Sequence, residues 1–215
     1  MRRTVFLVAI FSTFLSAIAP TVHAVSAELR EGIDYVRINP PQPQSGPGIE
    51  VVEFFSYGCP HCNDFEPSVA KWRAGLPKDV HFRRVPISFG RPQWKALAKL
   101  YLALVATGNL GKVDKEVFDA IHREKLPLTD DRAVLDWAVK KVADPKTFSE
   151  TYGSFGIQAG VASSDRMGLD AGISGVPAIA VGGRYLVVGK EVKSYQDILA
   201  IADRLIEMVR KSPQR

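Results

Sequence analysis

The sequence contains very few cysteines. Cys59 and Cys62 are the only two among 215 residues, so no disulfide within the chain can join distant segments. A bridge between them would close a loop of two intervening residues, and such a short loop removes little conformational entropy from the unfolded chain. The pair is therefore better suited to reversible redox chemistry than to structural stabilisation.

Histidine is scarce as well, which limits the alternative use of the cysteine pair as a zinc site. A structural zinc site needs four ligands, and after residue 24 the only histidines are His61, His81 and His122. His81 and His122 lie far apart in the sequence and lack the spacing of metal ligands. We therefore expect no bound metal and no other cofactor.

Long apolar runs are missing after the N-terminal segment. The chain begins with Met1-Arg2-Arg3 and continues with an apolar stretch over 5–18, shorter than the roughly 20 residues of a membrane span. Val22-His23-Ala24 provides a plausible cleavage site. The pattern predicts a signal peptide over 1–24, with an uncleaved membrane anchor as the alternative.

The sequence has no strongly basic segment. Its 28 Lys and Arg residues against 23 Asp and Glu residues give a net charge of +5, and removal of Arg2 and Arg3 with the signal peptide lowers it to +3. No run of basic residues is interleaved with aromatic residues. The composition therefore indicates a soluble protein without nucleic acid as a partner.

The residues around the cysteine pair predict a strand that leads into a helix. The predicted elements of the first part of the chain are strands over 35–38, 49–55 and 80–86 and a helix over 59–74. Pro60 fits the first turn of that helix, where a missing N–H costs nothing. Free N–H groups and the helix dipole favour a thiolate at Cys59. We expect Cys59 to be exposed with a lowered pKa and Cys62 to be less accessible.

The remainder of the chain predicts a helical block followed by a hairpin. Residues 89–155 show several helical patterns, one of them capped by Thr129, and a further helix is expected to end near residue 171. Gly182-Gly183 separates two short β-prone runs, as in a tight hairpin. Ser194 with Asp197 predicts a capping box before the last helix. The pattern indicates an α/β core interrupted once by helices.

Two motifs carry a resemblance to a known family. The segment Glu53-Phe54-Phe55-Ser56-Tyr57-Gly58-Cys59-Pro60-His61-Cys62 resembles the active-site segment of the DsbA family, and Gly175-Val176-Pro177-Ala178 is similar to the cis-proline loop of the thioredoxin superfamily. The resemblance implies a thioredoxin fold with an inserted helical domain. The thioredoxin-like domain would comprise 25–88 and 156–215, and the insert 89–155.

The resemblance also implies a function. A member of this family donates its disulfide to newly exported, cysteine-containing proteins and is reoxidised by an inner-membrane, quinone-coupled oxidase of the DsbB type. We therefore expect a periplasmic protein dithiol:disulfide oxidoreductase that acts as a monomer.

The expected site residues follow from the two motifs. Cys59 and Cys62 would form the redox-active disulfide, with Pro60 and His61 between them to tune it. The other expected members are Glu53 for proton transfer and Val176 and Pro177 for substrate binding. Arg83 is a loose counterpart of a family lysine, and the sequence does not determine its role. For Glu53 the alternative is a carboxylate that faces solvent at a sheet edge.

Two related functions remain open from the sequence. A disulfide isomerase or reductase could use the same motif, but the related isomerases add an N-terminal dimerisation domain, for which the segment 25–48 offers no room. A peptide-binding chaperone would keep the groove without needing the cysteines.

Overall fold

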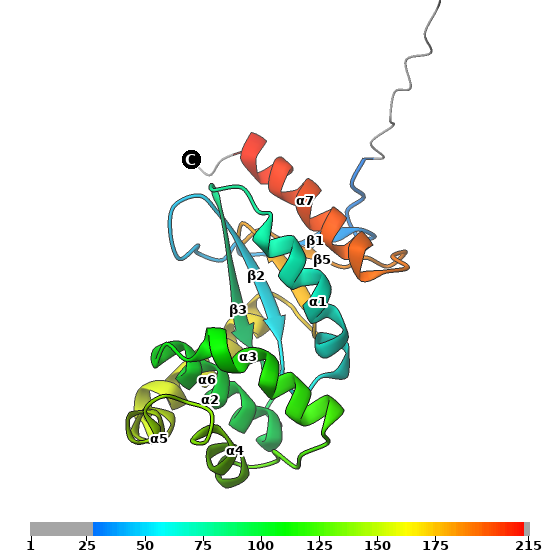
Figure 1. The fold of residues 1–215 in the computed structure, drawn as a ribbon. Helices are drawn as coiled ribbons and strands as arrows, with labels where there is room; N and C mark the ends of the chain where they lie inside the picture. Colours follow the sequence, from blue (N-terminus) through cyan, green and yellow to red (C-terminus); the bar gives the residue numbers. More distant parts are fainter. Residues whose placement is uncertain (1–27, 213–215) are drawn as a thin grey trace, which may run out of the picture.

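The computed structural model describes residues 28–212 of the chain (Figure 1). The predicted signal peptide over 1–24 lies outside these described residues. Among residues 28–212, no helix is both long enough and apolar enough to cross a membrane.

A five-stranded mixed sheet forms the centre of the upper lobe in Figure 1. The strands are β1 (Tyr35–Arg37), β2 (Ile49–Phe55), β3 (Val80–Pro86), β4 (Ala178–Val181) and β5 (Tyr185–Val187). Their order is β1-β5-β4-β2-β3, and only the β2 and β3 pair is parallel. Strand β2 is buried along its whole length because it lies between β4 and β3. The strands predicted around the cysteine pair are confirmed.

Helices account for most of the remaining chain. They are α1 (Pro60–Ala74), α2 (Pro92–Ala106), α3 (Leu110–Phe118), α4 (Asp131–Ala138), α5 (Pro145–Gly153), α6 (Phe155–Asp170) and α7 (Tyr195–Lys211), with a short π-helical turn η1 (Asp119–Arg123) after α3. The capping box of Ser194 and Asp197 is present at the start of α7. The predicted cap at Thr129 is wrong, because the carboxylate of Asp130 accepts the hydrogen bond from the Ala133 N–H at 2.9 Å.

The hairpin between β4 and β5 follows from its two glycines. Gly182 and Gly183 both have positive φ, +61° and +63°, as a two-residue type I′ turn requires. A Cβ on Gly183 would also lie 2.1 Å from the carbonyl oxygen of Gln42. The hairpin sets β5 beside β4, and the antiparallel pairing of β4 with β2 brings residues close to 177 to the end of β2.

Two helical layers cover the sheet. Helices α1 and α7 lie together on one face (Figure 1), where Phe65 and Val69 of α1 pack with Leu205 of α7. On the other face Phe54 and Ile87 pack with Met167 of α6. Each face of the sheet therefore has its own apolar cluster, and the site is held on a rigid frame.

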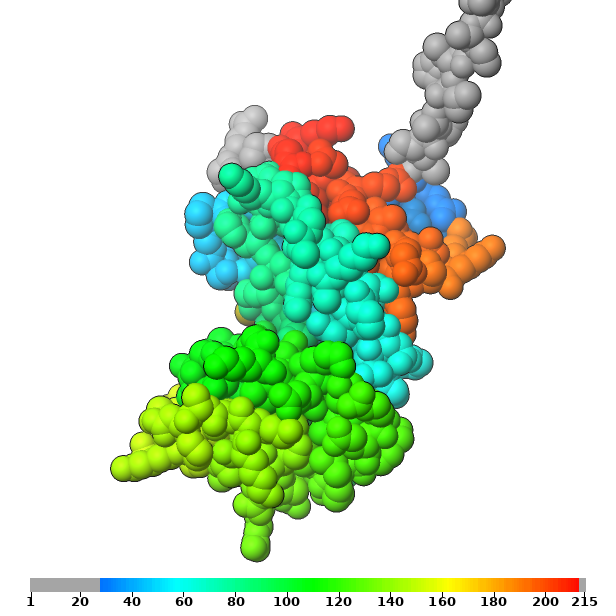
Figure 2. Space-filling view, in the orientation of Figure 1, coloured from blue at the N-terminus to red at the C-terminus, as the bar shows by residue number. Residues whose placement is uncertain are grey.

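The helical block of α2 to α5 forms the lower lobe in Figure 2. Its apolar cluster includes Leu100, Val117 and Phe148, and it extends to Cys59 and Cys62. The cysteine pair therefore packs against the helical block as well as against the sheet. We propose the division into 25–88 with 156–215 and an inserted domain over 89–155 on this basis.

Candidate active site

The cysteine pair opens helix α1. Cys59 is the N-cap residue with extended backbone angles, φ −92° and ψ 118°, and Pro60 is the first helical residue. The N–H groups of Cys62 and Asn63 both donate to the carbonyl of Cys59, at 3.1 and 3.2 Å. The predicted junction of strand, turn and helix is thus present, and it places the Cys59 side chain at the N-terminal end of α1, where the helix dipole favours a thiolate.

The loop before β4 meets the cysteine pair. The Val176–Pro177 peptide bond is cis, and the Cys59 thiol donates to the carbonyl oxygen of Val176 at 3.3 Å. These two residues are 117 positions apart. They meet because β4 pairs with β2 so that Phe54 lies opposite Ala178. The two sequence motifs therefore lie in contact.

The two thiols differ strongly in acidity. A hydrogen bond from Cys62 lowers the pKa of Cys59 to about 6, and the backbone N–H groups of Cys62 and His61 add to this effect against the cost of burial. Burial raises the pKa of Cys62, and the hydrogen bond to Cys59 raises it further. At neutral pH the reduced site therefore holds one thiolate, at Cys59, and one thiol, at Cys62.

The prediction that Cys59 is exposed is wrong for the residue as a whole. Cys59 has only 5% of its surface exposed and Cys62 has 1%. Trp94 and Val176 pack against the apolar cluster that contains both cysteines. The tertiary packing therefore leaves only a small part of Cys59 accessible, which restricts attack to one direction.

The residues between the cysteines face outward. Pro60 and His61 are both exposed, and the positive charge on a protonated His61 would lower the pKa of Cys59. The carbonyl of His61 accepts a hydrogen bond from the Tyr195 hydroxyl at 3.3 Å. The site rim is thus made by His61 and by the first residue of α7.

Glu53 is buried beneath this region. It is 1% exposed, and its Oε2 atom has no hydrogen-bond partner. Burial raises the pKa of Glu53 to about 8, although the nearby Arg84 opposes the rise. The alternative of a solvent-facing carboxylate is wrong, because β2 is a central strand. Glu53 is therefore an uncharged acid at neutral pH, and its charged form would raise the pKa of Cys62.

The buried cation on the face of Glu53 is Arg84, not Arg83. The parallel register places Arg84 opposite Glu53 and Arg83 opposite Val52. The Arg83 guanidinium instead binds Glu50, with Nε to Oε1 at 2.7 Å. Neighbouring side chains on a strand point to opposite faces, so Arg83 cannot be the charge partner of Glu53.

Arg84 joins three elements below the site. Its side chain is 2% exposed and forms ion pairs with Glu66 of α1 at 3.1 Å and with Asp114 of α3 at 2.6 Å. The Tyr57 hydroxyl donates to Asp114 at 2.5 Å. Sequence reasoning missed Arg84, Glu66 and Asp114. Only Arg84 gave a signal, as a charged residue in an apolar strand. The packing of α1 and α3 that brings Glu66 and Asp114 to it cannot be read from the sequence.

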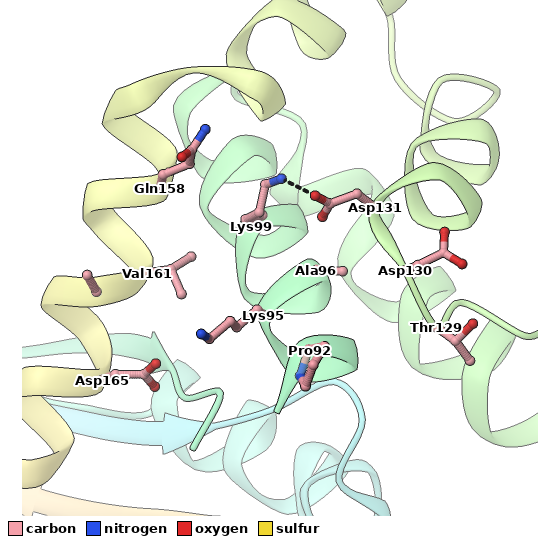
Figure 3. Close-up of a pocket in the computed structure, with 11 residues that line it drawn as sticks. Pro92, Lys95, Ala96, Lys99, Thr129, Asp130, Asp131, Gln158, Val161 and Asp165 are labelled. Atoms are coloured by element: carbon pink, nitrogen blue, oxygen red, sulfur yellow. Dashed lines mark hydrogen bonds and ion pairs between the residues drawn. The ribbon is translucent and has the colours of Figure 1, made fainter. Parts of the chain in front are cut away.

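The part of the chain that the structure describes contains no cluster of side chains suited to a metal ion. Nowhere among residues 28–212 do three His, Cys, Asp or Glu side chains form a group that could hold a metal ion. A cavity of about 910 Å³ lies between α2, α4 and α6, where Lys99 pairs with Asp131 at 2.7 Å (Figure 3). Its lining includes neither cysteine nor the Val176 loop.

The chain is similar to known proteins over almost its whole length. The family described as DSBA-like thioredoxin domain matches residues 50–200. The thiol:disulfide interchange protein DsbA of Azotobacter vinelandii is 36% identical over 214 residues, which cover 99% of this chain and 100% of that protein. DsbA of Bordetella pertussis is 38% identical over 198 residues, covering 90% of this chain and 92% of that protein.

Solved structures show the same fold. The crystal structure of Pseudomonas aeruginosa DsbA is 36% identical in sequence and has a TM-score of 0.79, with 86% of this chain and 96% of that chain covered. DsbA from Xylella fastidiosa gives 30% identity and a TM-score of 0.78, covering 86% of this chain and 99% of that chain. The predicted thioredoxin fold with an inserted helical domain is confirmed.

Proposed function

Because the chain belongs to the DSBA-like thioredoxin domain family and is a thiol:disulfide oxidoreductase, we propose that it donates a Cys59–Cys62 disulfide to newly exported proteins. The observation that carries this proposal is the difference between the two thiols. Cys59 lies at the helix N-terminus with a pKa of about 6, whereas Cys62 is buried with a raised pKa. A stabilised Cys59 thiolate favours the reduced form of the protein, and a disulfide whose reduced form is favoured is an oxidant.

The reaction proceeds in two exchanges. A substrate thiolate attacks the Cys59 sulfur, the Cys59–Cys62 bond breaks, and Cys62 leaves with the electron pair and takes up a proton. A second substrate thiolate then attacks the substrate sulfur of the mixed disulfide, and Cys59 leaves as the thiolate. The substrate loses two electrons and gains a disulfide, while the protein becomes the dithiol.

The Val176 loop would hold the substrate during these steps. The Val176 carbonyl oxygen lies 3.3 Å from the Cys59 sulfur, and in the disulfide form Cys59 has no proton to donate to it. The carbonyl then becomes available to a backbone N–H of an extended substrate, which would add a short strand beside the disulfide. Backbone recognition of this kind, next to Pro177, accommodates many substrate sequences.

Glu53 would supply or accept the proton at Cys62. A carboxyl group with a pKa of about 8 exchanges a proton readily near neutral pH. Glu53→Gln should therefore slow oxidation of a peptide dithiol several-fold between pH 7 and 8, with the alkylation rate of reduced Cys59 within about twofold of the unaltered protein. Stopped-flow oxidation and iodoacetamide labelling measure the two rates. If the Glu53→Gln variant oxidised the peptide dithiol at the rate of the unaltered protein, Glu53 would have no part in the mechanism.

The oxidant assignment is tested by the pH dependence of stability. The Cys59 thiolate exists only in the reduced protein, and its folded pKa of about 6 is below the ordinary value of 9.0. A depressed pKa stabilises the folded state above the unfolded pKa, and the effect is lost as pH falls from about 9 to about 6. After a discount for partial solvent screening, it amounts to about 1 kcal/mol at pH 7 and about two to three times that at pH 9.

Paired urea titrations of the reduced and oxidised proteins between pH 6 and 9 should therefore diverge, with the reduced form more stable at neutral pH and increasingly so above it. Cys59→Ala under reducing conditions serves as the control and should lack the slope. An oxidised form that is the more stable one across this range would contradict disulfide donation and favour a reductase.

The proposal also includes the compartment in which the protein acts and the partner that reoxidises it. A signal peptide over 1–24 would deliver the protein to the periplasm as a monomer, and a quinone-coupled inner-membrane oxidase of the DsbB type would accept the two electrons. Cell fractionation with and without residues 1–24, followed by thiol labelling in cells that lack such an oxidase, tests both steps. A periplasmic protein that stays oxidised without the oxidase would contradict the proposed partner.

A further inference from the structure

His122 contacts the redox turn from the helical block. It lies in η1, after α3, and its Nε2 atom is 2.7 Å from the carbonyl oxygen of Tyr57. A carbonyl oxygen can only accept a hydrogen bond, so Nε2 carries the proton and donates. The imidazole ring stacks on Phe118 with the ring centroids 6.2 Å apart and the planes inclined by 29°. Phe118 also packs against the Tyr57 ring, with the centroids 4.9 Å apart, so it contacts both His122 and the turn.

The peptide unit that receives this hydrogen bond is held from both sides. The Tyr57 carbonyl accepts from His122, and the N–H of the same peptide unit, on Gly58, donates to the Ser56 hydroxyl at 3.2 Å. The Cys59 N–H donates to the Ser56 carbonyl at 3.1 Å. The Tyr57–Gly58 peptide unit therefore has a partner at both its carbonyl and its N–H, and the partner of the carbonyl comes from the helical block.

Close packing around Gly58 makes the position of Cys59 sensitive to the orientation of the Tyr57–Gly58 peptide. A Cβ on Gly58 would lie 2.7 Å from Nε1 of Trp94, so the backbone at Gly58 approaches the indole as closely as a glycine permits. Cys59 follows directly as the N-cap residue of α1, where the N–H groups of His61 and Cys62 lower the pKa of its thiol. A rotation of the Tyr57–Gly58 peptide would move the Cys59 sulfur relative to those amides.

We propose that His122 is a positioning residue of the redox site, which holds the Tyr57 carbonyl and thereby keeps the Cys59 sulfur aligned with the first amides of α1. This inference rests on the proposed function. It gives the inserted helices a direct part in the redox site, since a residue 65 positions away in the sequence sets the orientation of the turn before Cys59. His122 acts through Tyr57 and does not contact the reacting sulfurs.

Three substitutions separate the hydrogen bond from the volume of the ring. His122→Gln keeps a side-chain N–H at nearly the reach of Nε2, His122→Asn keeps the amide but is too short, and His122→Leu keeps bulk without a donor. His81→Leu is the matched control, because His81 is exposed and lies at the opposite end of β3 from the site. Thermal melts establish that each variant is folded.

The readouts are the ionisation of Cys59, followed by thiolate absorbance at 240 nm, and the redox equilibrium of the cysteine pair with glutathione. Loss of one hydrogen bond of ordinary net strength should reduce the thiolate equilibrium constant about three- to tenfold in His122→Leu and His122→Asn. The glutathione equilibrium should shift by a similar factor toward the disulfide. His122→Gln and His81→Leu should stay within about twofold of the unaltered protein.

Two results would overturn the proposal. Folded His122→Asn or His122→Leu protein with unchanged ionisation and redox equilibrium would show that the hydrogen bond does not position Cys59. A His122→Gln protein as impaired as His122→Asn would show that the donor is not the relevant property. If His122→Leu does not fold, the comparison of His122→Gln with His122→Asn still tests the proposal. Failure of disulfide donation in cells would refute the proposed function but leave these titrations unaffected.

Discussion

Cys59→Ser is expected to abolish disulfide donation, whereas Cys62→Ser is expected to accumulate covalent complexes with substrates. The Cys59 sulfur takes part in both exchanges, as the electrophile in the first and as the leaving group in the second, because its thiolate is stabilised at the start of α1 and Cys62 is the more deeply buried of the two. A serine hydroxyl at residue 59 cannot form a disulfide. In Cys62→Ser the remaining Cys59 thiolate can still exchange with a disulfide, but no second cysteine resolves the product.

The measurement is non-reducing electrophoresis after incubation of each variant with a peptide disulfide, together with the rate of dithiol oxidation by each oxidised protein. Oxidation should fall to the uncatalysed background in both variants, and mixed disulfides should form only with Cys62→Ser. The double variant Cys59→Ser with Cys62→Ser controls for non-specific adducts. Equal trapping by the two single variants would reject the division of roles between the cysteines.

Arg84→Met is expected to destabilise the fold by about 3–5 kcal/mol, because it leaves two partly buried carboxylates without the buried cation that pairs with them. The Arg84 side chain is 2% exposed and binds both Glu66 and Asp114. Its guanidinium also lies 4.6 Å from the centre of the Phe55 ring. Methionine can fill much of the volume of the stem but supplies neither the charge nor the five N–H donors. The loss therefore combines unpaired acids with a broken link between α1, β3 and α3.

The penalty should depend on pH. Burial already raises the pKa values of Glu53 and Glu66 and Arg84 opposes the rise, so removal of Arg84 raises both pKa values further above those of the unfolded chain. A carboxyl group whose pKa is raised in the folded state does not destabilise the protein at low pH. It lowers the free energy of unfolding as pH rises from the unfolded-state pKa through the folded-state pKa. Urea titrations at pH 5 and pH 8 should therefore show the larger loss at pH 8.

Arg73→Met is the matched control. Arg73 pairs with the same Glu66 at 3.3 Å, but its side chain is 34% exposed, and exposed ion pairs contribute about 0–1 kcal/mol. A loss below 1 kcal/mol for Arg84→Met, equal to that of Arg73→Met at both pH values, would show that burial of this cation does not govern the stability of the site.

Much of the fold was predictable because its signals are local. The prolines and cysteines at the start of α1, the two glycines of the hairpin and the capping box of Ser194 and Asp197 each act within a few residues. The strands β2 and β3 were predicted with the bounds they have in the structure, since apolar β-prone runs mark buried strands. The cap of α4 was misplaced by one residue, because Thr129 and Asp130 are both good N-cap residues.

The site was predictable only in part. By itself the sequence determined that Cys59 begins a helix beside Cys62, and that a Val176–Pro177 motif accompanies them. The tertiary structure alone decided that Cys59 is buried in contact with Val176, that Arg84 and not Arg83 shares the face of Glu53, and that His122 binds the turn before Cys59. These are contacts between segments far apart in the chain. Strand register and helix packing set them, and both depend on side chains from the whole core acting together.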